Sequence, residues 1–160
     1  MTLTYADIDP SGFDRRFLVQ LYIVHPTIAP AEITSALGLE AHFAHTVGEP
    51  RRTPKGNTLP GSYPDTRWRH SIQCSAANQW FVGELETLVN RLEPYKAFLS
   101  HLVDTGGRAE LIVKFLGDGY FGDSLPSSML TRIGDLRLDL GIEVRSGSAF
   151  SDGWISGLSA

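Results

Sequence analysis

The sequence predicts an α+β domain built as a two-layer sandwich, with a mixed sheet of four to five strands and helices packed mainly on one face. Four segments alternate apolar and polar side chains with the period of two that is typical of strands: residues 17–24, 68–75, 110–116 and 142–146. Segments with helical spacing lie between them, so that two strand–helix–strand units are joined by a long, kinked helix. The chain of 160 residues has the length of one domain.

The first expected strand, Phe17–Val24, is apolar on both faces. Phe17 and Leu21 share one face of the strand, whereas Leu18 and Tyr22 share the other. This pattern is typical of a strand that is central in its sheet and covered on both sides. Helices are expected to cover one face of this strand. The other face could be covered by the long loop, the C-terminal tail or a second subunit.

The first expected helix begins at Pro30, because the first helical turn tolerates a residue without an N–H. Ile33, Ala36 and Leu37 form its apolar stripe, and Gly38 is the expected stop because glycine enters the left-handed region at little cost. Residues 45–67 then show no clear periodicity and contain four prolines and three glycines, which predicts a long loop.

The second strand, Trp68–Ser75, has one polar face that is exposed to solvent and one apolar face. The long helix is expected from about Gln79 to Leu92, with a kink at Pro94 and a continuation to about Val103. A third helix is expected after Pro126, between the third strand and the last. Residues 1–14 are interpreted as a polar N-terminal arm, 15–146 as the single domain and 147–160 as a Gly/Ser-rich tail.

Composition narrows the class of protein. A net charge of −4 argues against a general nucleic-acid binder, which usually carries a strongly basic face. No apolar run reaches the ~20 residues of a membrane span, and the first ten residues do not resemble a signal peptide. Cys74 is the single cysteine, so no internal disulfide forms and a cytoplasmic location is the default.

One motif resembles a nucleotide fingerprint. The run from Gly117 to Gly122 matches G-x-G-x-x-G between a strand and a helix. Pro126 follows too closely for the usual helix, and no acidic residue ends the next strand, so a flexible turn is the preferred interpretation. An enzyme or cofactor binder that uses this turn with His70 remains the alternative, and its contact residues would be Gly117, Asp118, Gly119 and Gly122.

Metal and catalytic signals are weak. His42 and His45 are three residues apart, a spacing that binds metals on one face of a helix, but no further ligand supports them. Cys74 lies on the apolar face of its strand, which is typical of an inert thiol. We therefore expect no metal, no cofactor and no catalytic residue.

The basic segment around the second strand is the more informative feature. Arginines with neighbouring aromatic rings suit a carboxylate, a phosphate or an acidic protein surface. A solvated loop is the plainer interpretation of the same charges. The proposed ligand-binding residues are Arg51, Arg52, Tyr63, Arg67, Trp68 and Arg69.

The first half also resembles a known family. His25-Pro26, Ala31-Glu-Ile-Thr34, Leu37-Gly-Leu39, Gly48-Glu49 and a strand opened by Trp68 are similar to the bacterial family catalogued as domain of unknown function 4279. The resemblance covers residues 15–146 and implies a small bacterial α/β domain without a known activity. By this likeness, Leu37, Gly38, Gly48 and Trp68 are structural markers.

These observations favour a non-enzymatic binding module for a protein or an anionic small ligand, with a toxin-neutralising immunity protein as one option in that class. A purely structural homodimer that uses the two-sided first strand is the third hypothesis. Neither nucleic acid nor a membrane is an expected partner.

Overall fold

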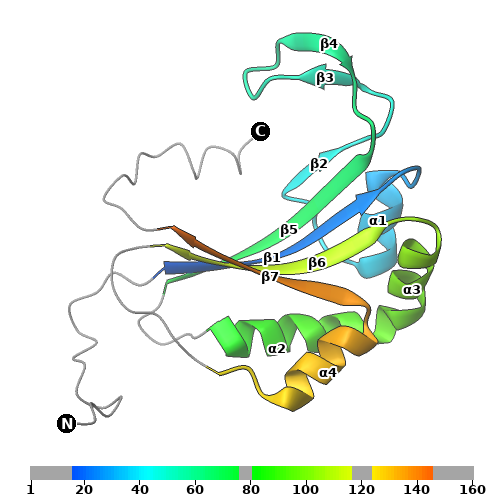
Figure 1. Ribbon diagram of the computed structural model, residues 1–160. Coiled ribbons are helices and arrows are strands. Elements are labelled where there is room, and N and C mark those ends of the chain that lie inside the picture. Colours follow the sequence, from blue (N-terminus) through cyan, green and yellow to red (C-terminus); the bar gives the residue numbers. More distant parts are fainter. Residues whose placement is uncertain (1–15, 76–80, 117–123, 146–160) are drawn as a thin grey trace.

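The computed structural model describes residues 16–75, 81–116 and 124–145, and in these ranges it has two sheets and four α-helices (Figure 1). The α+β architecture, with helices on one side of a five-stranded sheet, confirms the predicted fold class. The predicted arm and tail lie outside the described residues. The elements are β1 (Arg16–His25), α1 (Pro30–Leu37), β2 (Phe43–His45), β3 (Pro50–Arg52), β4 (Thr58–Ser62), β5 (Thr66–Ser75), α2 (Phe81–Leu92), the 3₁₀ turn η3 (Glu93–Tyr95), α3 (Lys96–Asp104), β6 (Arg108–Leu116), α4 (Ser127–Asp135) and β7 (Leu138–Arg145).

The main sheet is mixed, with the strand order β2-β5-β1-β6-β7. Strand β1 is central, as its two-sided apolar pattern predicts, and pairs antiparallel with both β5 and β6. Strands β6 and β7 are parallel, so the unit β6-α4-β7 is a crossover connection. The first expected unit differs, because β1 and β5 are antiparallel and the strand parallel to β1 is the short β2 on the far side of β5.

The helix boundaries follow the local signals. Helix α1 begins at Pro30 and is closed by Gly38, which has φ of 61° and donates its N–H to the carbonyl of Thr34 at 2.9 Å. The long helix is broken into α2 and α3 by the turn η3, which contains Pro94. Proline lacks the N–H that a continuous helix needs, so the chain passes through a tighter turn there.

The hydrophobic core lies between the sheet and the helices. Val19, Leu21 and Ile23 of β1 point into it and are fully buried, together with Leu85 and Leu88 of α2. Helices α2, α3 and α4 lie against this side of the sheet (Figure 1), and α1 contributes Ile33 and Leu37 to the same core. We call this side the helix face and the opposite side the open face.

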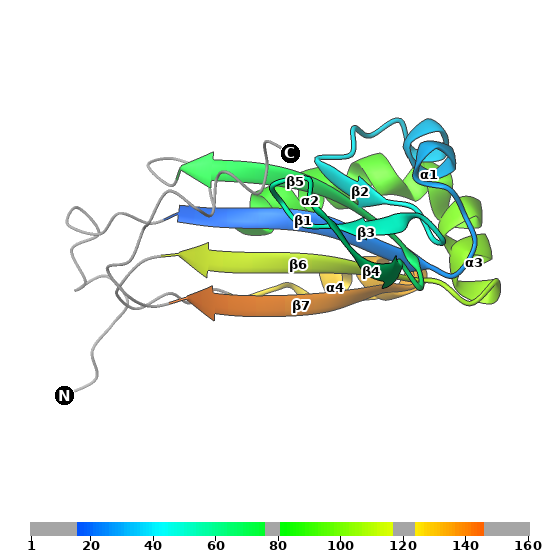
Figure 2. The same cartoon turned by 90° about the horizontal axis from the view of Figure 1, so that it is seen from above.

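The segment predicted as a long loop, residues 45–67, contains two short strands, and a third ends at its first residue. Strand β2 joins the main sheet, and β3 and β4 form a separate hairpin. These strands have only three to five residues, and those of the hairpin are exposed throughout, so they leave no burial pattern in the sequence. Figures 1 and 2 together place the hairpin above the open face, on the side away from the helices.

Candidate functional site

The candidate site lies on the open face at the end nearest the hairpin. Residues that are directly paired in neighbouring strands share a face, so their side chains form rows across the sheet. The first row on the open face is His45, Arg67, Val24 and Arg108, and the second is Phe43, Arg69, Tyr22, Glu110 and Asp139. The β2–β5 side of these rows therefore carries two arginines between aromatic rings.

We define the basic–aromatic cluster as Phe43, His45, Tyr63, Asp65, Arg67 and Arg69. Arg67 donates from Nε to Oδ1 of Asp65 at 3.0 Å, and its side chain is 45% exposed. This bond lowers the pKa of Asp65 and raises the pKa of Arg67. Both groups are charged at neutral pH, and Tyr22 contributes further to the raised pKa of Arg67.

Arg69 is held over an aromatic ring. Its guanidinium carbon lies 4.9 Å from the centroid of Phe43, a cation–π contact across the β2–β5 pair. Its Nε is enclosed and has no hydrogen-bond acceptor among the residues that the structure describes. An enclosed charged donor without an acceptor carries a desolvation cost.

His45 packs between the hairpin and the sheet. Its ring stacks on Tyr63 with centroids 3.7 Å apart and planes 6° apart. Its Nε2 lies 3.7 Å from Oδ1 of Asp65, beyond hydrogen-bond distance, and has no partner within the described ranges. Burial, then the charge of Arg67, lowers the pKa of His45, although Asp65 opposes the change. His45 is therefore neutral at pH 7.

Tyr63 also connects the hairpin to the cluster. Its hydroxyl accepts the backbone N–H of Arg52 at 3.1 Å, and its own backbone bonds to Gly48 and Glu49. Arg51 and Arg52 are both exposed on β3. The structure thus places Arg67, Arg69 and Tyr63 in the cluster, and Arg51 and Arg52 on the hairpin attached to it.

Trp68 does not belong to this surface, and its inclusion in the predicted ligand-binding set was wrong. It lies between Arg67 and Arg69 in β5 and therefore points to the helix face, where it is fully buried. Its Nε1 donates to Oγ1 of Thr34 in α1 at 2.9 Å. Trp68 therefore fastens α1 to the sheet.

Of Phe43, His45 and Asp65, the sequence interpretation considered only His45, and that residue only as a metal ligand. Strand β2 brings the first two beside β5, and Asp65 immediately precedes β5. The available signal was the Phe43-Ala-His45 alternation, which is typical of a short strand with two aromatic side chains on one face.

The histidines do not form a helical metal pair. His45 lies in a strand and faces Tyr63, whereas His42 accepts the backbone N–H of Ser71 and packs 5.0 Å from the ring of His70. His70 bonds through Nδ1 to the carbonyl of Glu40, and burial lowers its pKa. Within the described residues, no group of three or more metal-binding side chains occurs.

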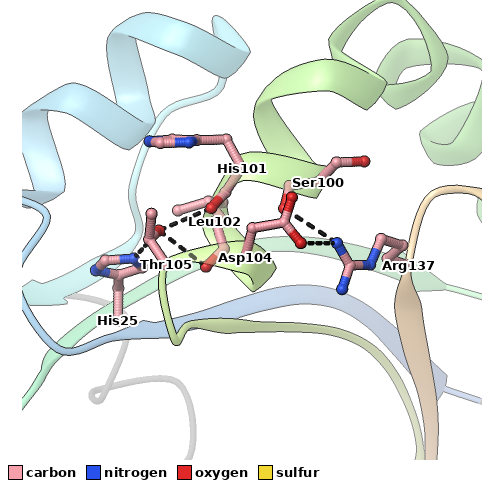
Figure 3. Close-up of polar contacts among 7 residues, drawn as sticks. All are labelled: His25, Ser100, His101, Leu102, Asp104, Thr105 and Arg137. Carbon is pink, nitrogen blue, oxygen red and sulfur yellow. Dashed lines mark hydrogen bonds and ion pairs between the residues drawn. The ribbon is translucent and has the colours of Figure 1, made fainter.

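A second polar network joins β1 to α3 and is structural (Figure 3). Nδ1 of His25 accepts the backbone N–H groups of Thr27 and Ile28, so its proton is on Nε2, which donates to Oγ1 of Thr105 at 2.9 Å. The hydroxyl of Thr105 in turn donates to the carbonyl of His101 at 2.7 Å. His25 is buried, and burial lowers its pKa.

The glycine-rich turn, with Gly117, Asp118, Gly119 and Gly122, lies outside the described residues. Its proposed partner His70 pairs with Leu21 of β1, whereas Leu116, directly before the turn, pairs with Arg16. Five residues along a strand correspond to about 17 Å. The sheet register thus separates His70 from the start of the turn.

Comparison with protein families supplies one finding. Residues 15–146 match the model of the family described as a domain of unknown function, DUF4279. The chain belongs to the DUF4279 family. The match spans every described element, and the motif residues have structural roles: Thr34 accepts the bond from Trp68, and Gly48 adopts φ of 81°. No curated protein and no solved structure matches the chain. The helices among the described residues are all too short or too polar to cross a membrane.

Proposed function

We propose that this DUF4279 protein is a non-enzymatic binding module whose ligand presents a carboxylate or phosphate to the basic–aromatic cluster. The ligand is either a small anion or an acidic side chain of a partner protein, because both offer the same oxygen acceptors. Arg67 and Arg69 supply the charge, and Phe43 and Tyr63 supply flat walls beside it.

The guanidinium of Arg69, held over the ring of Phe43, is the observation that carries this proposal. Phe43 fixes the guanidinium over its ring, so the charged group is oriented before any ligand arrives. Arg67, two positions along the same face of β5, has its Nε on Asp65, and its side chain is 45% exposed. Two neighbouring guanidinium groups favour a planar or tetrahedral oxyanion.

Isothermal titration of the full chain with inorganic phosphate, citrate and a glutamate-rich peptide tests the proposal. We expect at least one probe to bind, and the Arg69→Ala variant to bind it at least tenfold more weakly. Binding of phosphate or citrate indicates a small anion, whereas binding of the peptide alone indicates an acidic protein segment.

Arg91→Ala is the matched control, because it removes the same charged group from an exposed position in α2. Its affinity for the probe is expected to equal that of the unchanged chain. The proposal fails when none of the probes binds, or when Arg69→Ala and Arg91→Ala weaken binding equally, since the effect would then reflect net charge alone.

A further inference from the structure

The outer edge of β7 carries the most exposed large apolar side chains of the described residues. Ile142 is 61% exposed and Val144 is 68% exposed, although both point toward the helix face of the sheet. Strand β7 is the last strand in the order β2-β5-β1-β6-β7, and no described strand pairs with its outer side. An eight-residue edge with apolar side chains is a template for another strand.

The sequence of β7 is complementary to itself when two copies run antiparallel. With Ile142 opposite Ile142 of a second copy, Leu140 faces Val144, Gly141 faces Glu143 and Asp139 faces Arg145. Leu140, Ile142 and Val144 then lie on the helix side of both sheets, and the charged residues lie on the open side. Each exposed apolar side chain thereby gains an apolar partner, and Asp139 and Arg145 of opposite charge face each other.

We propose that two copies of this chain associate through β7 around a two-fold axis at Ile142, which joins the sheets into one of ten strands. Such an interface is isologous, because the same patch serves both subunits. Helix α4 packs against β7 and carries a further exposed apolar side chain, Leu130, which is 48% exposed.

This inference is independent of the proposed binding function. The basic–aromatic cluster lies around β2 and β5, at the opposite edge of the sheet from β7, so neither proposal needs the other. It also differs from the sequence-based dimer hypothesis, in which the first strand forms the interface. That strand is β1, whose open face rather than its edge would form that interface.

A cysteine on the two-fold axis tests the proposed register. Directly opposed residues of antiparallel strands have Cα atoms about 4.5–5.5 Å apart, within the reach of a disulfide. In a Cys74→Ser background, the Ile142→Cys variant is expected to form a covalent dimer on mild oxidation, as seen on a non-reducing gel. Glu143→Cys is the matched control, because it is similarly exposed but lies diagonally from its counterpart, at about 7–8 Å.

Light scattering tests the association itself. The chain of 17.6 kDa is expected at twice that mass at tens of micromolar. Ile142→Lys and Val144→Lys are both expected at the monomer mass with an unchanged circular dichroism spectrum, whereas Leu59→Lys, an exposed apolar residue of the hairpin, is expected to remain dimeric. A monomeric unchanged chain, a dimer that survives both lysine variants, or equal cross-linking of the two cysteine variants would overturn the proposal.

Discussion

The two faces of the sheet use the same strands for different purposes. On the helix face, Trp68 and the alternate residues of β1 are fully buried, and the one polar atom of Trp68 is bonded to Thr34. On the open face of the same strand β5, Arg67 is half-exposed and Arg69 keeps an enclosed donor without an acceptor among the described residues. Polar groups in a protein core are nearly always hydrogen-bonded. A surface that binds a polar ligand instead keeps hydrogen-bond donors for that ligand.

This difference separates stability from binding at neighbouring positions. Trp68 and Arg69 are adjacent in sequence, yet they point to opposite faces. A change on the helix face should therefore alter the free energy of unfolding, whereas a change on the open face should alter affinity and leave folding nearly intact.

Replacement of the core indole is expected to have the largest effect. Trp68→Ala removes a fully buried side chain and its bond to Thr34, which should lower the free energy of unfolding by about 3–5 kcal/mol. Urea denaturation followed by circular dichroism measures this loss. Trp68→Phe keeps most of the apolar volume and should lose less than half as much; an equal loss in both variants would contradict the packing role.

Gly107 offers a second way to disturb the helix face. An added Cβ would lie 2.5 Å from Cδ2 of His25 and 2.8 Å from the carbonyl of Leu102, so Gly107→Ala should lower the free energy of unfolding by about 1–3 kcal/mol. In Gly134→Ala, the same added carbon meets nothing within 4 Å inside helix α4. That control should gain about 0.5–1 kcal/mol, because alanine favours a helix. Thermal unfolding of the two variants should move in opposite directions.

Acid should weaken the fold through histidines on both faces. Burial lowers the pKa values of His25, His45 and His70 below 6.5 in the folded chain. The unfolded chain therefore binds more protons as the pH falls below about 6.5, so the free energy of unfolding should fall between pH 7 and pH 5. Urea denaturation at several pH values measures this slope.

His45→Phe removes one of these titrating groups and keeps a ring stacked on Tyr63. Its slope with pH should be shallower than that of the unchanged chain. A steeper slope, or higher stability at pH 5 than at pH 7 in the unchanged chain, would contradict the assigned directions of the pKa changes.

The smallest stability effect is expected on the open face. Arg69→Ala loses a cation–π contact with Phe43, but it also removes an enclosed donor that has no acceptor in the described part of the chain. The two changes oppose each other, so the free energy of unfolding should stay within about 0.5 kcal/mol. A loss of several kcal/mol in urea denaturation would place Arg69 in the core of the fold instead.

Local signals in the sequence predicted much of the architecture. Pro30 and Gly38 marked the ends of α1 because their backbone preferences act within single residues. The two-sided apolar pattern of β1 predicted its central position, because a strand between two others can be covered on both faces. The strands β3 and β4 escaped prediction because both are short and exposed, so no alternation of burial distinguishes them.

The candidate site was less accessible to prediction. Arg67 and Arg69 stood out by charge, but His45 reaches them only through the pairing of β2 with β5, which no local pattern specifies. Trp68 was grouped with them by proximity in sequence, although the period of two already placed it on the other face. The ligand-binding role of Arg51, Arg52, Tyr63, Arg67 and Arg69 stays a prediction.

The central claim is that the open face binds the ligand and the helix face stabilises the fold. Chemical-shift mapping tests this claim most directly. The full chain labelled with ¹⁵N would be titrated with the anion or peptide that binds in calorimetry. We expect the backbone signals of Phe43, His45, Arg67 and Arg69 to move together and those of Leu85 and Leu88 to stay fixed. Shifts confined to the helices, or an unchanged response in Arg69→Ala, would contradict the claim.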